Sequence, residues 1–407
     1  MRRETSRTGL PPSRWPVLMT PLAATVAAAA VMASPPASPG AAHTRGMTGA
    51  AHTPGMTARA SLARQAIAYV FAAGFNSGGI VTPIRTATNT ALKPIKVGHL
   101  PEDIDTNSPD IAVTPDGKTV YVTTAHSVTP IRTATSTALK PIKVGRLPIA
   151  IAITPDGKTV YVANRRSGTV TPIATAANKP GKPVKAGKNP RVIAITPDGK
   201  TAYTVNAGSG TVTPIRTATN TALKPIKVGR VPIAIAITPD GKTAYVANLD
   251  SGTVTPIRTA TNTARKPIRV GRNAEAIAIT PDGKTAYVAC GNPGTVVPIA
   301  IATNTPGKAV KVGIAPGPIA ITPDGKTAYV VNDFSGTVTP LRTDTNTALP
   351  PITVGSLPDS IAITPNGKTA YVVNLNSRTV TPIRTATNTA LKPIKAGTLP
   401  FEIAITP

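Results

Sequence analysis

The sequence predicts an all-β protein folded as a β-propeller, a ring of four-stranded antiparallel blades. A block of about 42 residues repeats nearly unchanged from Tyr69 to Pro407, and a fixed period of this length is typical of stacked supersecondary units. Aromatic residues make up only 3% of the chain. The core must therefore be built from Ile, Val and Ala, and β-branched residues suit pleated, half-buried surfaces. Long amphipathic helical patterns are absent.

Four strand-like runs can be placed in each unit. The first is an alternating Ile/Ala run, such as residues 149–153, and a Pro-Asp-Gly-Lys turn at 155–158 leads to the second run at 159–164. In such a turn Pro presets φ and Gly accepts positive φ. The third run is 169–175, and the fourth is the Lys-Pro-Ile-Lys-Val-Gly segment at 224–229. Four antiparallel strands in about 40 residues indicate one propeller blade.

The tyrosine of the second run marks the period and gives the number of blades. It occurs eight times, at Tyr69, Tyr121, Tyr161, Tyr203, Tyr245, Tyr287, Tyr329 and Tyr371. The repeats open at a second strand and stop after a first strand. We expect the C-terminal strand at Phe401 to pair with the N-terminal strand at 66–71, which closes the ring and removes an exposed edge. Eight blades are predicted, with seven as the alternative because the first unit is irregular.

The repeats resemble those of a known family. The segments 161–164, 203–206, 245–248 and 371–374 look like the Tyr-Val-Thr-Asn signature of YVTN β-propeller repeat proteins, and Thr-Ala-Thr-Asn-Thr at 217–221 matches as well. The resemblance covers roughly 340 residues and implies a secreted or envelope-associated propeller. Two departures, Pro-Ile-Arg in the third strand and Lys-Pro-Ile-Lys in the fourth, make this chain more basic than the family pattern.

The N-terminal segment predicts export. Residues 1–42 combine an arginine-rich start with an alanine-rich apolar stretch and are predicted to be a signal peptide, with a retained membrane anchor as the alternative. Residues 43–61 are predicted to be a flexible linker, and 62–407 the propeller. No later segment has the ~18 uninterrupted apolar residues that a membrane span needs. We expect a monomer that is secreted or associated with the cell envelope.

The formal net charge of +27 favours anionic partners. One loop position, just before the first strand of a unit, carries a basic residue or histidine in five successive units. These residues are His99, Arg146, Lys188, Arg230 and Arg272. In a propeller this loop leads from the rim to the central channel, so the five are predicted to form an arc that binds an anionic ligand or polymer. The alternative is ordinary solvated loop charge.

The chain shows no recognisable catalytic, metal or cofactor motif. Six carboxylates belong to the Pro-Asp-Gly turns, and Glu102, Asp103, Asp105 and Asp110 form the one acidic cluster, which is either a solvated loop or a cation site. Cys290 stands where other units carry Asn, which indicates drift at a turn position. We therefore expect no catalytic residues, no metal and no cofactor.

These observations predict an exported, non-enzymatic propeller that serves as a binding or scaffold module at the cell envelope. An anionic envelope polymer or an acidic protein is the expected partner. One alternative is a propeller enzyme of the lactonase or quinoprotein type, which would need carboxylates or histidines that converge on the channel. The other is non-specific nucleic-acid binding through backbone charge.

Overall fold

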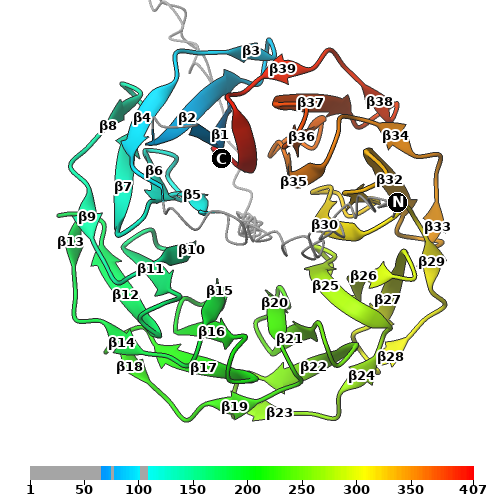
Figure 1. Ribbon diagram of the computed structural model, residues 1–407. Coiled ribbons are helices and arrows are strands. Elements are labelled where there is room, and N and C mark those ends of the chain that lie inside the picture. The colour runs from blue at the N-terminus through cyan, green and yellow to red at the C-terminus, as the bar shows by residue number, and fades with distance from the viewer. Residues whose placement is uncertain (1–65, 75–77, 101–108) are drawn as a thin grey trace, which may run out of the picture.

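The computed structural model describes residues 66–74, 78–100 and 109–407, and these form a closed ring of eight antiparallel β-sheets (Figure 1). We number the sheets as blades 1 to 8, beginning with the sheet that contains β1. The prediction of an eight-bladed all-β propeller is confirmed. The predicted signal peptide and linker lie outside the described residues. Among the described residues, no helix is long and apolar enough to cross a membrane.

The innermost strand of each blade lies nearest the centre of the ring (Figure 1). For blades 2 to 8 and then blade 1, these strands are β5 (Ile111–Val113), β10 (Pro148–Ile153), β15 (Pro190–Ile195), β20 (Pro232–Ile237), β25 (Arg272–Ile279), β30 (Pro316–Ile321), β35 (Pro358–Ile363) and β40 (Leu399–Ile405). Each of them contacts the innermost strands of both neighbouring blades. The side chains of these strands are therefore crowded together around the ring centre.

The second and third strands of each blade form a long hairpin. For blades 1 to 8, the second strands are β1 (Ile67–Gly74), β6 (Thr119–Thr123), β11 (Thr159–Asn164), β16 (Thr201–Asn206), β21 (Thr243–Asn248), β26 (Thr285–Asn292), β31 (Thr327–Asn332) and β36 (Thr369–Asn374). The third strands are β2 (Gly78–Arg85), β7 (Ser127–Arg132), β12 (Thr169–Ala174), β17 (Thr211–Arg216), β22 (Thr253–Arg258), β27 (Thr295–Ala300), β32 (Thr337–Arg342) and β37 (Thr379–Arg384).

The outer strand of each blade is split into two short segments that both pair with the third strand. These pairs of segments are β3 (Thr90–Ala91) and β4 (Ile95–Gly98), β8 (Thr137–Ala138) and β9 (Ile142–Lys143), β13 (Lys179–Pro180) and β14 (Val184–Lys185), β18 (Thr221–Ala222) and β19 (Ile226–Lys227), β23 (Thr263–Ala264) and β24 (Ile268–Arg269), β28 (Thr305–Pro306) and β29 (Val310–Lys311), β33 (Thr347–Ala348) and β34 (Ile352–Thr353), and β38 (Thr389–Ala390) and β39 (Ile394–Lys395).

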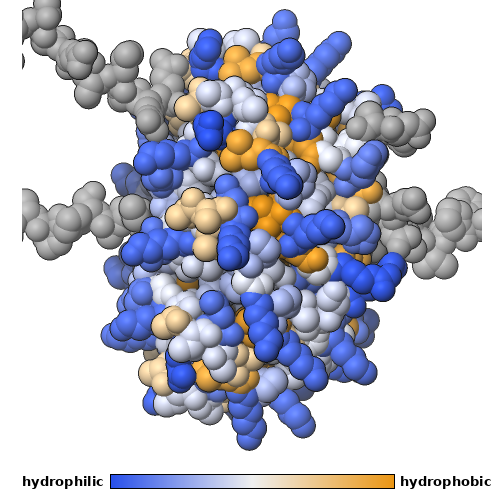
Figure 2. All heavy atoms as spheres, turned by 90° about the vertical axis from the view of Figure 1, so that its left-hand side faces the viewer, coloured by the Kyte–Doolittle hydropathy of each residue, from blue (hydrophilic) through white to orange (hydrophobic). Residues whose placement is uncertain are grey.

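Proline explains the split. In blade 5, Pro256 pairs with Tyr245 on its inner side, whereas the outer ladder involves only the residues on either side of it, at 253–254 and 257–258. Pro256 has no N–H to donate, and its carbonyl oxygen accepts the backbone N–H of Arg265 at 2.8 Å. The rim seen from the side of β8, β9 and β13 is covered mostly by hydrophilic side chains (Figure 2), which protects such edges from pairing with other chains.

Blade 1 closes the ring with strands from opposite ends of the repeat region. Strand β40 pairs with β1 in antiparallel register, from Ala68 opposite Ile405 to Ala73 opposite Leu399. The backbone N–H of Ile67 also donates to Oγ1 of Thr406 at 2.9 Å, across 339 residues of sequence. The predicted closure is confirmed.

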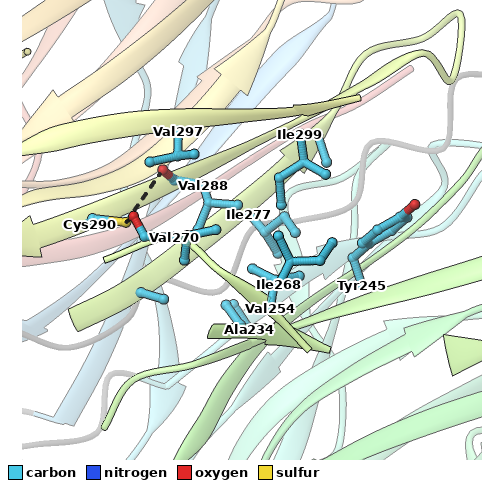
Figure 3. Packing of buried hydrophobic residues seen from close by; sticks show 13 residues of the cluster. Ala234, Tyr245, Val254, Ile268, Val270, Ile277, Val288, Cys290, Val297 and Ile299 are labelled. Atoms are coloured by element: carbon cyan, nitrogen blue, oxygen red, sulfur yellow. Dashed lines mark hydrogen bonds between the residues drawn. The ribbon is translucent and has the colours of Figure 1, made fainter. Parts of the chain in front are cut away.

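The hydrophobic core lies between adjacent blades. One cluster joins Ala234, Tyr245 and Val254 of blade 5 to Ile277 and Val288 of blade 6 (Figure 3). The cluster also holds Cys290, whose Sγ lies 3.5 Å from the carbonyl oxygen of Val270. Similar clusters of Ile, Val, Ala and Tyr fill the other junctions between blades. Burial of these side chains supplies the main driving force for stacking the blades.

A buried tyrosine hydroxyl also links each blade to the next. Tyr203 donates to Oδ1 of Asn262 at 2.7 Å, and the tyrosines of blades 2 to 8 all make this bond. The accepting asparagine has positive φ, which Asn tolerates better than most residues. Blade 1 is the exception. The hydroxyl of Tyr69 has no partner, and Ser136 stands where the other blades carry the asparagine.

We expect Ser136→Asn to stabilise the protein by about 1 kcal/mol, because it supplies the missing acceptor and places Asn at a residue with φ of 51°. The urea midpoint of unfolding would measure the gain. In a Tyr69→Phe background the hydrogen-bonding part of the gain should vanish. An equal gain with and without the Tyr69 hydroxyl would show that the bond does not form.

Candidate functional site at the ring centre

The five residues of the predicted arc lie on one face of the ring, which we call the mouth face. This face is formed by the loops that lead into the innermost strands and by the turns between second and third strands. The backbone N–H groups of Arg146, Lys188 and Arg230 donate to serine Oγ atoms in those turns, at 2.6 to 2.7 Å. The side chains of these three residues, and those of His99 and Arg272, are exposed. Their role as anion ligands stays a prediction.

Basic side chains also gather around a pocket on the mouth face of blades 3 and 4. The pocket has a volume of about 490 Å³, and its lining includes Arg165, Arg166, Lys185 and Lys188. Nearer the ring centre, Arg191 lies in β15 at the register shift between Pro190 and Val192. Burial and the neighbouring Arg165 lower the pKa of Arg191 to about 10. This side of the ring therefore has a positive potential.

Acidic side chains occupy the remaining inner surface near the same face. Five carboxyl groups come from five consecutive blades, from blade 6 around to blade 2. They are Glu275 on β25, Asp333 just after β31, Asp359 on β35, Glu402 on β40 and Asp110 just before β5. Four of them are at least 96% buried, at 3% or 4% exposure, and Asp359 is partly exposed. The site thus has a basic side and an acidic side.

Asp110 and Glu402 form a pair at the junction of blades 1 and 2. Asp110 accepts the backbone N–H of Ile111 on Oδ1 and that of Ile151, from blade 3, on Oδ2, both at 2.7 Å. Glu402 Oε1 accepts the hydroxyl of Ser360 from blade 8 at 2.7 Å. Each carboxyl group is therefore held by a neighbouring blade as well as by its own.

The pKa values of both carboxyl groups of this pair are raised. Burial raises the pKa of Asp110 to about 7, although its two backbone hydrogen bonds oppose the shift. Burial, with the nearby charge of Asp110, raises the pKa of Glu402 well above its usual range. Two neighbouring carboxyls, one protonated and one ionised, can act as an acid and a base.

Glu275 and Asp333 form a second pair, in blades 6 and 7, and each has an oxygen atom without a hydrogen-bond partner. Glycine makes room for both carboxyl groups. A Cβ at Gly291 would collide with Oε1 of Glu275, and a Cβ at Gly317 would lie 3.4 Å from Oδ1 of Asp333. Burial raises the pKa of Glu275 to about 7 and that of Asp333 well above its usual range, with Asp359 and Glu275 adding to the shift of Asp333.

The sequence-based prediction missed most of this acidic arc. It placed Asp110 in a local cluster with Glu102, Asp103 and Asp105, which lie outside the described residues, and took that cluster as the one acidic spot. That interpretation is wrong, because four other blades contribute carboxyls at the same level of the ring. The signal was present as departures from the repeat: Glu275 and Glu402 stand where blade 5 carries Ile233 and Ala234.

The turn aspartates are structural, as predicted. Asp240 Oδ1 accepts the hydroxyl of Thr238 at 2.6 Å and the backbone N–H of Lys242 at 3.0 Å, and the same arrangement recurs in the other Pro-Asp-Gly turns. Within the described ranges, no three His, Cys, Asp or Glu side chains lie close enough together to hold a metal ion.

The chain is similar in part to a known family of enzymes. Residues 174–353, less than half of the chain, match a family described as lactonase, 7-bladed beta-propeller. The matched segment runs through blades 4 to 7 and includes Arg191, Glu275 and Asp333. The family description has seven blades, whereas this ring has eight. No curated protein matches the sequence.

Solved structures share the fold. Kuenenia stuttgartiensis hydrazine synthase is 25% identical over 70% of this chain and 99% of that one, with a TM-score of 0.59. Dihydro-heme d1 dehydrogenase NirN is 13% identical over 83% and 74% of the two chains, with a TM-score of 0.70. A functionally unknown protein from Desulfotomaculum acetoxidans DSM 771 is 17% identical over 84% and 98%, with a TM-score of 0.59. The last two show similarity of fold alone.

These comparisons contradict the prediction of a non-enzymatic scaffold. The match to a lactonase family favours the alternative, an enzyme-like propeller. That alternative requires carboxylates near the channel, and the structure places Glu275, Asp359 and Glu402 on innermost strands. Within such regular repeats, Glu275, Asp359 and Glu402 form no motif in the sequence, although all three lie on innermost strands.

The buried carboxyls predict an unusual dependence of stability on pH. Glu275 keeps its proton up to about pH 7 in the folded protein but loses it near pH 4.3 when unfolded. Between these values the folded state binds more protons, so the free energy of unfolding should fall as pH rises from 5 to 8. The turn aspartates have lowered pKa values, and their contribution is lost only in more acidic solution.

Glu275→Gln should make this fall smaller, because the amide does not ionise. Urea midpoints at pH 5 and pH 8 would show the variant gaining stability over the original protein mainly at pH 8. Asp250→Asn, an exposed change on the mouth face of blade 5, is the matched control. Parallel pH profiles for the original protein and Glu275→Gln would contradict the assignment.

Proposed function

We propose that the protein is a hydrolase that opens a lactone or a related small ester at the mouth-face end of its innermost strands. The observation that carries the proposal is the pair Asp110 and Glu402, two neighbouring buried carboxyls with raised pKa values in a ring that is similar in part to lactonase propellers. Ester hydrolysis needs a base to activate water and an acid to protonate the leaving oxygen. This pair offers both.

In this mechanism Asp110 is ionised, since two backbone N–H groups favour its anion. It accepts a proton from a water molecule as the water oxygen adds to the acyl carbon. Glu402, whose pKa is raised by burial and by the charge of Asp110, donates its proton to the ring oxygen as the acyl C–O bond breaks. The products are a hydroxyl group and a carboxylic acid. Ser360 orients Glu402 through its hydrogen bond.

The basic side of the ring fits the same proposal. Arg191 lies on an innermost strand, and Lys188 lines the adjacent pocket. Both could hold an anionic part of the substrate or the negative charge that develops on the carbonyl oxygen. We retain two further elements of the sequence interpretation as proposals: a relationship to YVTN repeat proteins, and export to the cell envelope.

Hydrolysis of γ-butyrolactone and δ-valerolactone, followed by base uptake at constant pH, tests the proposal. We expect Asp110→Asn and Glu402→Gln each to lower kcat/KM by about 100-fold or more, the usual range for loss of a general acid or base. Asp250→Asn should retain full activity.

Circular dichroism and the urea midpoint would establish that the variants are folded. Ser360→Ala should lower kcat less than Glu402→Gln does, since it removes only an orienting bond. Failure of the original protein to hydrolyse lactones or simple esters, or activity that survives in both carboxyl variants, would refute the proposal.

A further inference from the structure

Blades 6 and 7 hold two buried carboxyl groups, Glu275 and Asp333, with features of a ligand site beyond the proposed acid and base pair. We call the surroundings of these two groups the Glu275 and Asp333 recess. Glu275 and Asp333 are both 3% exposed, and each keeps one oxygen atom without a hydrogen-bond partner. A buried acceptor that is left unpaired costs free energy, so such atoms in a folded protein call for a donor from elsewhere. Both carboxyls face glycines of their own blades, and the carboxyl group of Glu275 occupies the space that a Cβ at Gly291 would fill.

The mouth face next to this recess is apolar. Among the described residues, the large hydrophobic side chains that are exposed are Ile314, at 65%, and Phe334, at 50%, and both belong to blade 7. Phe334 directly follows Asp333 in the chain. The backbone N–H of Ile314 donates to Oγ of Ser335 at 2.8 Å, which ties the loop of Ile314 to the turn of Phe334. A fixed apolar pair therefore stands beside the buried acidic groups.

We infer that the Glu275 and Asp333 recess binds the ammonium group of a small organic amine whose apolar part rests on Ile314 and Phe334. An ammonium group has three N–H donors, enough to satisfy both free carboxyl oxygens. A metal ion fits less well, because within the described part of the chain no three ligating side chains converge. The exposed side chains of Ile314 and Phe334 supply apolar surface for the alkyl part of the amine.

Binding is coupled to release of a proton. Burial raises the pKa of Glu275 to about 7, so the empty recess holds protons at neutral pH that an ammonium group must displace. The other titratable groups that face Glu275 and Asp333 are Asp359 on β35 and Cys290 on β26. Burial raises the pKa of Cys290 to about 12, and it stays neutral throughout the range of the test.

Isothermal titration calorimetry of the full chain with hexylamine tests the inference. A group with a pKa of about 7 is ionised in about one tenth of molecules at pH 6 and about nine tenths at pH 8. We therefore expect hexylamine to bind about tenfold more tightly at pH 8, whereas hexanol should bind weakly at both values. Glu275→Gln combined with Asp333→Asn should weaken binding at pH 8 by about tenfold or more and remove the pH dependence.

Two further variants locate the parts of the site. Phe334→Ser should weaken the binding of hexylamine but not that of ethylamine, and it leaves the buried carboxyls in place. Asp250→Asn, which removes an exposed carboxylate from the mouth face of blade 5, should change nothing. Equal affinity for hexanol and hexylamine, affinity independent of pH, or unchanged binding in the double variant would overturn the inference.

Calcium chloride serves as a separate titrant. Tight Ca²⁺ binding that requires Glu275 and Asp333, without hexylamine binding, would assign the recess to a metal ion and overturn the inference as well. All of these titrations measure binding without turnover. The result is therefore independent of lactone hydrolysis, which the Asp110 and Glu402 variants decide.

Discussion

The structure depends on the contact of eight innermost strands around one ring. Every blade places its innermost strand against two others, so a side chain at the mouth-face end of such a strand has little access to water. Apolar residues fill this position in blades 3 and 5, where Ile149 and Ile233 are buried. A carboxyl group there is desolvated and has charged neighbours from adjacent blades, and this environment raises its pKa.

Crowding at the centre also separates the charges of the site. Carboxyls come from blades 6, 7, 8, 1 and 2, whereas Arg165 and Arg191 come from blades 3 and 4. Like charges are neighbours on each side of the ring. A molecule bound across the centre would therefore experience a field directed from one side of the ring to the other, and polar ligands would bind in a preferred orientation.

The fold could be predicted from the sequence because the same pattern of strands and turns recurs in eight units. The spacing of Tyr203 and Tyr245 and the Pro-Asp-Gly turns each have one local structural meaning, and the structure agrees with both. The site was not predicted, since its residues are exceptions to the repeat. Glu275 and Asp333 look like isolated substitutions until the ring brings blades 6 and 7 together. Sequence motifs are defined by spacing along the chain, whereas these residues are neighbours only because adjacent blades pack side by side in the ring.

Ring closure has a consequence for how the site comes into being. Glu402 belongs to β40, and β40 takes its place only by pairing with β1, across a sequence separation of 339 residues for the bond between Ile67 and Thr406. Forming so distant a contact is entropically costly and comes late in assembly. Until then the carboxyl that faces Asp110 is missing, although seven blades can already be in register. Asp110 and Glu402 therefore come together only when the ring has closed.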